Sequence, residues 1–220
     1  MTKLAIIHTT PVTIEMLKRL AEEKLPGYEI INLVDDSILP ELSINGGDVS
    51  NVQERLIQYA KNAERAGAKV ILNACSSVGE VVSLMRQEVA IPVVRIDEAM
   101  VECAVKTGDR ICVVATLPTT LNPTIRLIQE KAKVLGKEVQ IQSVLAEEAY
   151  ARLILGDKDG HDEALEKVLV QLVEGTDVVV LAQASMARVV EKLPTEKRGH
   201  FITSPILGME RVATTMKRTV

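Results

Sequence analysis

The sequence predicts an α/β protein made of two similar Rossmann-like lobes, each with a parallel sheet and helices on both faces. Short apolar runs alternate with segments of helical period along the chain, the apolar runs are continuously rich in Val, Ile and Leu, and three segments recur in the second half. Alternating strands and helices favour a parallel sheet. Strands buried on both faces lose the apolar–polar alternation of half-exposed strands.

The first half of the chain contains four predicted strands. The strand at 3–9 precedes a helix over 12–24 whose apolar residues share one face, and a Pro-Gly pair separates that helix from the strand at 28–34. Residues 35–48 lack a clear period, and we expect a loop long enough to act as a cover or as part of an interface. The elements predicted next are a helix at 49–66, a strand ending at Cys75, a helix from 77, a strand at 91–96, and a helix capped by Asp97 that ends near Lys106.

A second series of elements begins after Gly108-Asp109. The polar segment at 156–161, "GDKDGH", separates two predicted helical segments, and we expect His161 and His200 to be surface or strand-entry residues. The other predicted elements are a strand at 110–115, a helix over 120–135, strands at 138–144, 177–183 and 200–204, a helix before the last strand, and a terminal helix.

Three segments of the first half return at nearly the same spacing. "HTTPVT" at 8–13 returns as "ATLPTT" at 115–120, offset by 107 residues, and "ACSSVGEVV" returns as "AQASMARVV", offset by 108. The strand "PVVRI" lies opposite "HFITS" at the same offset of 108. A shared register predicts two lobes related by an approximate two-fold axis. We assign residues 1–98 and 206–220 to the first lobe and 99–205 to the second.

Composition limits the partners. A net charge of −4 without Lys or Arg runs argues against nucleic acid and anionic membranes, and 2 % aromatic residues are too few for base stacking. The apolar runs are far shorter than the ~20 residues that cross a bilayer, and no signal peptide is recognised, so we expect a cytoplasmic protein. Three cysteines without CxxC spacing predict neither a disulfide framework nor a metal site.

The duplicated turns predict a cleft with a thiol in it. Ligands of open parallel sheets bind beyond the carboxyl ends of the strands, so two facing lobes would bring the Thr-x-Pro-x-Thr turns and the Ser-containing turns around one cleft. Cys75 precedes a predicted helix, whose amino terminus lowers a thiol pKa. We therefore expect a partly ionised thiol that acts as base or acid. An alternative is that Cys75 is a small core residue, as we predict for Cys103 and Cys112.

Small neutral donors surround the predicted cleft. Hydroxyl and backbone N–H groups suit a carboxylate or a developing enolate, so we expect proton transfer at a carbon next to a carboxyl group. Isolated Ser and Thr turns usually cap helices, and only their duplication makes them site candidates. His8 either assists proton movement or satisfies the end of the first strand. The predicted substrate-binding residues are Thr9, Thr10, Asn73, Ser76, Ser77, Thr116, Thr119, Thr120 and Ser185.

The duplicated lobes, "NACSSVG" and "VVVLAQASMA" together resemble the aspartate/glutamate/hydantoin racemase superfamily over essentially the whole chain. The resemblance implies an active site between two Rossmann-like lobes, without cofactor or metal. It also implies one cysteine on each lobe, of which one removes the α-proton and the other delivers a proton to the opposite face. Cys75 matches the first cysteine, and Ser76, Ser77 and the Thr-x-Pro-x-Thr turns match the family's carboxylate-binding donors.

The second motif departs from the family. Where the family reads like "LGCAGMA", this chain has "LAQASMA", so Gln183 stands at the position of the second cysteine. A glutamine side chain forms hydrogen bonds but does not exchange a proton usefully. Arylmalonate decarboxylases of the superfamily use a single cysteine, which matches the second motif, and maleate isomerases use a cysteine as nucleophile.

We therefore predict a cofactor-independent racemase or isomerase that moves the α-proton of a small carboxylate through Cys75, while Gln183 orients the substrate. The alternatives are a single-cysteine decarboxylase and a non-catalytic protein that binds small acids, which the glutamine supports. We expect a homodimer without nucleic-acid or membrane partners. The sequence leaves open the substrate and the recognition of a second carboxylate, because only Arg95 and Arg188 are cations near the turns.

Overall fold

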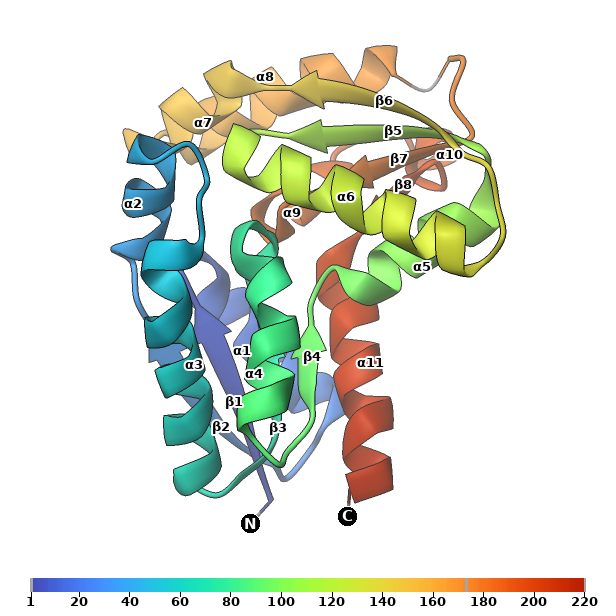
Figure 1. Ribbon diagram of the computed structural model, residues 1–220. Helices are drawn as coiled ribbons and strands as arrows, with labels where there is room; N and C mark the ends of the chain where they lie inside the picture. The colour runs from blue at the N-terminus through green and yellow to red at the C-terminus, as the bar shows by residue number, and fades with distance from the viewer. Residues whose placement is uncertain (1, 173, 220) are drawn as a thin grey trace. The chain divides into compact units, whose positions relative to one another are not determined.

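The computed structural model describes residues 2–172 and 174–219 (Figure 1). The chain divides into two compact units, one comprising the residues up to Glu98 and those from Pro205 onward, the other comprising Ala99–Ser204. Each unit carries a four-stranded sheet in which every pair of neighbouring strands is parallel. The predicted α/β class with two parallel sheets is confirmed.

The sheet of the first unit has the order β2-β1-β3-β4. Its connections are helices, as parallel strands require. The elements are β1 (Lys3–His8), the 3₁₀ helix η1 (Pro11–Thr13), α1 (Ile14–Lys24), β2 (Glu29–Val34), α2 (Ile38–Ile44), α3 (Ser50–Arg65), β3 (Ala68–Asn73), the 3₁₀ helix η2 (Ser76–Val81), α4 (Val82–Glu88), β4 (Val93–Arg95) and α11 (Ser204–Thr219).

Helices pack on both faces of this first sheet. Helices α2, α3 and α4 form one core with Ala5 and Ile7 of β1. Leu4 and Ile6 alternate with them along the strand and are fully buried on the opposite face, where α1 lies (Figure 1). Helix α11 also belongs to this unit, and its Glu210 lies 4.0 Å from Lys24 of α1. Burial on both faces explains the continuous apolar runs of β1 and β3.

The sheet of the second unit has the order β6-β5-β7-β8, the same topology as the first. Its elements are α5 (Glu98–Thr107), β5 (Arg110–Ala115), α6 (Pro118–Val134), β6 (Gln140–Leu145), α7 (Glu147–Ile154), α8 (Lys158–Gln171), β7 (Val178–Leu181), the 3₁₀ helix η3 (Ala184–Met186), α9 (Ala187–Val190), α10 (Thr195–Arg198) and β8 (Phe201–Thr203).

The second sheet is likewise covered on both faces. Helices α7, α8 and α9 pack on Cys112 and Val114 of β5, while α6 runs along the opposite face (Figure 1). Strand β6 is an edge strand, and Gln140 and Gln142 on it are exposed. Polar side chains on an edge strand disfavour the addition of a further strand.

The strand registers reproduce the sequence repeat. Ala5 of β1 pairs with Ile71 of β3, and Cys112 of β5 pairs with Val179 of β7. These pairs are offset by 107 residues in the first strand and by 108 in the second, as in the recurring segments. The repeat therefore describes two sheets of one topology and one register. The approximate two-fold axis stays a prediction.

One prediction about local structure is wrong, and a second differs in its bounds. Residues 35–48 are not a plain loop, because they contain α2. Arg55 of α3 holds this segment: its Nη1 donates to Asp35 at 3.2 Å, and its Nη2 pairs with Glu41. The predicted helices on either side of the polar segment 156–161 are α7 and α8, but the break between them is shorter than expected, because α8 already begins at Lys158.

None of the helices within residues 2–172 and 174–219 has the length and apolar character needed to cross a membrane.

Candidate active site

Cys75 lies two residues beyond the end of β3 and immediately before η2. Its backbone is extended, with φ −132° and ψ 117°, and the chain turns from strand to helix at this point. The side chain is half-buried and packs against the core under α2, α3 and α4. The thiol thus stands at the carboxyl end of a central strand, the edge at which parallel sheets bind ligands.

Opposing effects set the pKa of the Cys75 thiol. Burial is the largest effect and raises the pKa, whereas the Thr9 hydroxyl and the backbone N–H groups of Ser77 and Val78 lower it. The Thr9 hydroxyl is buried and makes no hydrogen bond of ordinary geometry, so its interaction with the sulfur is weak. The net shift is upward, and the prediction of a partly ionised thiol is therefore wrong. At neutral pH the group rests as a thiol.

The Asn73 side chain holds the backbone of Cys75. Its Nδ2 donates to the Cys75 carbonyl oxygen at 3.0 Å, and the Ile96 N–H donates to the Asn73 carbonyl at 3.1 Å. Asn73 is fully buried, and its Oδ1 has no hydrogen-bond partner within the described residues. The geometry gives Asn73 a positioning role, and its predicted contact with substrate stays a prediction.

A buried ion pair supports the turn that follows Cys75. Arg95 Nε and Nη2 donate to the two carboxylate oxygens of Asp97 at 2.6 and 2.9 Å. A Cβ atom on Gly79 of η2 would lie only 2.3 Å from Arg95 Nε, so the guanidinium fills the space beneath this glycine. Burial disfavours the charged guanidinium and lowers the Arg95 pKa, but the attraction of the Asp97 carboxylate is stronger, so the pKa is raised overall. Arg95 is thus neutralised by Asp97 rather than left open to a substrate.

His8 is buried at the end of β1 with both ring nitrogens engaged. Nδ1 lies 3.0 Å from Thr13 Oγ1, and Nε2 lies 3.0 Å from Asn32 Oδ1. Burial lowers the His8 pKa more than the Asn32 hydrogen bond raises it. Because the amide oxygen only accepts, Nε2 carries the proton. This geometry favours the second of the two interpretations, in which His8 satisfies the strand end.

In the second unit, Gln183 binds the turn that follows β5. The Thr116 backbone N–H and hydroxyl donate to Gln183 Oε1 at 2.6 and 2.9 Å. A backbone N–H only donates, so the contact fixes which end of the amide faces Thr116. The Gln183 NH₂ group has no hydrogen-bond partner in the described part of the chain. It is a neutral donor at the position where the resemblance to the racemases implies a second cysteine, an assignment that stays a prediction.

The other predicted residues of the first unit lie at the expected strand ends. Ser76 and Ser77 are buried at the start of η2, where the Ser77 hydroxyl also favours the Cys75 thiolate. Thr10 is half-buried and caps η1, and its Oγ1 accepts from the Val12 N–H at 3.4 Å.

The corresponding residues of the second unit occupy the turns after β5 and β7. Thr120 is buried in the first turn of α6, and its neighbour Thr119 has a buried Oγ1 without a hydrogen-bond partner in residues 2–172 and 174–219. Ser185 is half-buried in η3. Whether these hydroxyls bind substrate stays a prediction.

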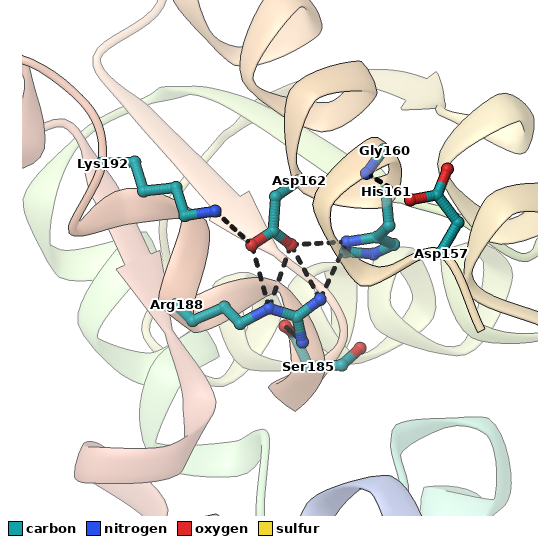
Figure 2. Close-up of polar contacts among 7 residues, drawn as sticks. All are labelled: Asp157, Gly160, His161, Asp162, Ser185, Arg188 and Lys192. Atoms are coloured by element: carbon teal, nitrogen blue, oxygen red, sulfur yellow. Dashed lines mark hydrogen bonds and ion pairs between the residues drawn. The ribbon is translucent and has the colours of Figure 1, made fainter.

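The sequence did not predict a cluster of charges beside η3 (Figure 2). Asp162 is almost fully buried and accepts from Arg188 Nε at 2.9 Å and from Lys192 Nζ at 2.7 Å. His161 Nδ1 lies 2.8 Å from Asp162 Oδ1, and Arg188 Nη1 donates to the Ser185 carbonyl at 3.3 Å. His161 is fully buried, so its prediction as a surface or strand-entry residue is wrong.

Local geometry fixes the start of the helix that carries this cluster. Asp157 caps α8 by accepting from the Gly160 N–H at 2.8 Å. A Cβ atom at position 160 would meet the Asp157 carboxylate, so any side chain there would displace the capping group. The motif "GDKDGHD" therefore contains a helix cap, a sequence signal that could have placed His161 in a helix. His200 is half-buried and directly precedes β8, as predicted.

The two other cysteines differ in exposure. Cys112 is fully buried in β5, and burial raises its pKa to about 11. Cys103 lies in α5 as predicted but is half-buried rather than sealed in the core. The described residues contain no group of three or more His, Cys, Asp or Glu side chains that could hold a metal ion.

Comparison with known proteins identifies the family. A model of the Asp/Glu/hydantoin racemase family matches residues 6–206. The chain therefore belongs to the Asp/Glu/hydantoin racemase family, which confirms the resemblance seen in the sequence. Membership supports a racemase-type isomerase function and a small carboxylic acid as substrate. No curated protein sequence matches the chain.

Several solved structures with a similar fold are racemases or are named after racemases. Glutamate racemase RacE1 from Bacillus anthracis is similar with a TM-score of 0.77 and 15 % identity, covering 99 % of this chain and 82 % of that one. A putative Asp/Glu racemase from Yersinia pestis is similar with a TM-score of 0.70 and 19 % identity, covering 97 % of this chain and 98 % of that one. Allantoin racemase from Klebsiella pneumoniae is similar with a TM-score of 0.67 and 17 % identity, covering 99 % of this chain and 89 % of that one. Identities this low establish a shared fold.

Proposed function

We propose that this chain is a cofactor-independent racemase that exchanges the α-proton of a small carboxylic acid, with Cys75 as a proton-transfer residue. The observation that carries the proposal is the setting of the Cys75 sulfur. It lies at the carboxyl end of β3, and the N–H groups of Ser77 and Val78 favour its thiolate. Family membership supplies the reaction type.

The proposed step is a proton transfer without change of oxidation state. The Cys75 thiolate takes the α-proton, so an S–H bond forms while the C–H bond breaks and its electron pair moves onto the carboxyl group. Neutral donors stabilise the resulting enediolate without holding the ground state as tightly as a cation would. The proposed donors are the hydroxyls of Thr9, Thr10, Ser76 and Ser77 and the backbone N–H groups at 76–78, all of the first unit.

The raised pKa of Cys75 shapes this step. The resting thiol must first lose its proton, and burial opposes the loss. Once formed, a thiolate in a partly desolvated place is a stronger base than one in water. A raised thiol pKa therefore suits the abstraction of a weakly acidic α-proton better than a lowered one, provided that the surrounding donors hold the transient charge.

A decarboxylase is the second candidate, and Gln183 favours it. If the second unit supplies no proton-transfer group, one thiol still protonates an enediolate formed by loss of carbon dioxide. The third candidate is a protein that only binds small acids. It is supported by the Thr116–Gln183 contact, which holds the turn after β5 although no second thiol is present there.

Incubation in D₂O tests these candidates. We expect α-deuteration of aspartate, glutamate or a related acid without gas release, and loss of this exchange in Cys75→Ala but not in Cys103→Ala, which removes the other half-buried thiol. Carbon dioxide release from a substituted malonate would instead establish the decarboxylase. Acid binding without exchange, or exchange that survives in Cys75→Ala, would refute the proposed role of the thiol.

A further inference from the structure

A groove lies beside the last strand of the first sheet. Strand β4 pairs with β3 alone, and its residues 93 and 94 line a groove of about 430 Å³. Helix α11, which runs beside β4 in Figure 1, contributes Arg211 and Thr215 to the same groove. The rest of the lining comes from α4, from the residues before β4 and from the first residue of α5, and all of it belongs to the first unit. A groove of this volume has the size of a small-molecule site.

The outer edge of β4 is protected against a further strand. The Ile71 N–H donates to the Pro92 carbonyl, so the next carbonyl, that of Val93, points away from β3. This carbonyl accepts from Arg86 Nε at 2.9 Å, and the strand has only three residues. Short edge strands and charged side chains on them keep other strands from pairing. An extended peptide would have to displace Arg86, so the groove suits a compact ligand better.

Two guanidinium groups and one carboxylate line the groove, those of Arg86, Arg211 and Glu98. Arg86 Nη2 donates to Glu98 Oε2 at 3.0 Å, whereas Arg86 Nη1 has no hydrogen-bond partner among the residues that the structure describes. The Glu98 carboxylate is mostly buried and balances one of the two cations, so its lining keeps one net positive charge. Guanidinium groups bind carboxylates through charge-assisted hydrogen bonds. The charge therefore favours a ligand with a single carboxylate.

The uncharged part of the lining is mostly aliphatic. Val89, Ile91 and Pro92 are half-buried, and no aromatic residue is among the described residues that line the groove. The Thr215 hydroxyl donates to a carbonyl of its own helix at 2.8 Å, and the Ala90 N–H donates to a glutamate of α3 at 2.7 Å. With these donors in use, a carboxylate would bind the guanidinium groups. A branched carbon chain would cover the aliphatic surface, whereas a flat ring would find nothing to stack on.

We propose that this groove binds a small monocarboxylic acid with a branched aliphatic chain. The carboxylate binds Arg86 Nη1, Arg211 adds a second positive charge, and the chain packs on Val89, Ile91 and Pro92. The groove is separate from the candidate active site of the same unit. Its residues 91 and 92 precede the amino end of β4, whereas the thiol follows the carboxyl end of β3, and the two strands are parallel. Binding at this groove therefore goes beyond the proposed function and does not depend on it.

Titration calorimetry with 4-methylpentanoate and the uncharged 4-methylpentanamide tests the proposal. We expect the acid to bind the wild type about 10–100-fold more tightly than the amide, the usual range for a hydrogen bond to a charged group. Arg86→Met keeps an aliphatic stem without the guanidinium and should weaken binding of the acid by a similar factor. Arg19→Met is the control, because this exposed arginine pairs with Glu15 on α1, outside the groove, and the acid should bind it as it binds the wild type. Equal affinities for acid and amide, or for Arg86→Met and the wild type, would overturn the proposal.

A second measurement locates the acid even if Arg86→Met unfolds. In ¹³C-methyl-labelled wild-type protein we expect the Val89 and Ile91 resonances to shift when 4-methylpentanoate is added, while Ile44, an exposed apolar residue of α2, stays fixed. Slower alkylation of Cys75 without shifts at Val89 and Ile91 would place the acid at the candidate active site and overturn the proposal. Absence of binding at millimolar acid would do the same. Neither measurement uses turnover, so a failure of the proposed function would leave their outcome unchanged.

Discussion

Thr116 donates both its backbone N–H and its hydroxyl to Oε1 of Gln183, at 2.6 and 2.9 Å. The same two positions of the first unit hold Thr9 and Cys75, where a threonine hydroxyl approaches a thiol. The repeat thus preserves a threonine facing the residue at the end of the third strand, while the chemistry of that residue differs. In the second unit the two hydrogen bonds from Thr116 to Gln183 join uncharged groups and hold the two turns together; we call this pair of bonds the lock.

Two substitutions at position 183 separate this lock from substrate binding. Gln183→Ala leaves the Thr116 N–H without its acceptor, and we expect a loss of about 1–3 kcal/mol in the free energy of unfolding. Gln183→Glu keeps the accepting oxygen and should unfold within about 1 kcal/mol of the wild type. It replaces the NH₂ donor by a negative oxygen, so calorimetric binding of aspartate or glutamate should weaken. A wild-type stability of Gln183→Ala would show that the lock contributes nothing.

The contact of Gly79 with Arg95 predicts a cost for any side chain at position 79. In Gly79→Ala the new Cβ would lie 2.3 Å from Arg95 Nε, and Asp97 prevents the guanidinium from swinging away. Overpacking of this kind costs about 1–3 kcal/mol, which urea denaturation would measure. Because η2 must shift, alkylation of Cys75 should change in rate as well.

The matched control for Gly79→Ala is Gly199→Ala. A Cβ atom there meets nothing within 4 Å, and the backbone is helical with φ −63°. We expect no loss of stability and a gain of up to about 1 kcal/mol from the stiffer unfolded chain. If both variants lose equal stability, the ion pair does not limit position 79.

The internal repeat allowed the fold to be predicted from the sequence. It is visible both in the recurring turn segments and in the registers of the two sheets. Offsets of 107 and 108 residues in the turns return in the registers of both sheets, in which Ala5 pairs with Ile71 and Cys112 with Val179. Strand β5 has the bounds that its apolar run predicts. Parallel strands buried on both faces give a strong local signal, and the sheet order follows from the shared topology.

What the sequence did not predict depends on partners far along the chain. Helix α2 has seven residues with Pro40 in its first turn, and Arg55 of the next helix anchors it. His161 lies in a polar segment and meets Arg188 only in the folded protein. The upward shift of the Cys75 pKa likewise arises from tertiary burial, whereas the sequence shows only the adjacent helix start.

The direction of the Cys75 pKa shift predicts its reactivity. Only the thiolate is alkylated by iodoacetamide, so the midpoint of the Cys75 alkylation profile should lie above its ordinary value of 9.0. Mass spectrometry of each cysteine peptide would measure it, with Cys112, whose pKa is about 11, nearly inert at pH 8. Thr9→Val removes a group that favours the thiolate and should move the Cys75 midpoint further up. Thr10→Val is the control, because its hydroxyl serves the Val12 N–H.

The same shift has a consequence for stability. A folded-state pKa above the ordinary value of 9.0 means that the contribution of this thiol to stability is complete below that value and is lost as the pH rises through the folded-state pKa. Cys75→Ala should therefore lose less stability than the wild type between pH 8 and 10. A midpoint of alkylation below the ordinary value, or identical pH profiles of the two proteins, would contradict the assignment of burial as the dominant effect.

The carboxylate of Asp162 predicts the acid limb of the stability curve. Its folded-state pKa of about 2 lies below the ordinary value of 3.8, so its contribution is present above about pH 4 and is lost as the pH falls toward 2. Asp162→Asn should lose about 1–3 kcal/mol at pH 7, because hydrogen bonds from Arg188 and Lys192 to a charged group disappear. Both cations are partly exposed and regain water, which limits the loss.

Asp159→Asn provides the matched control for this carboxylate. Asp159 lies on the same helix but is exposed, so its replacement should leave the free energy of unfolding at pH 7 within about 0.5 kcal/mol of the wild type. Urea denaturation at several pH values between 2 and 7 would follow all three proteins. The wild type and Asp159→Asn should converge on Asp162→Asn as the pH falls, because protonation of Asp162 then removes the same charge. A constant gap between Asp162→Asn and the wild type across this range would show that the carboxylate charge does not stabilise the fold.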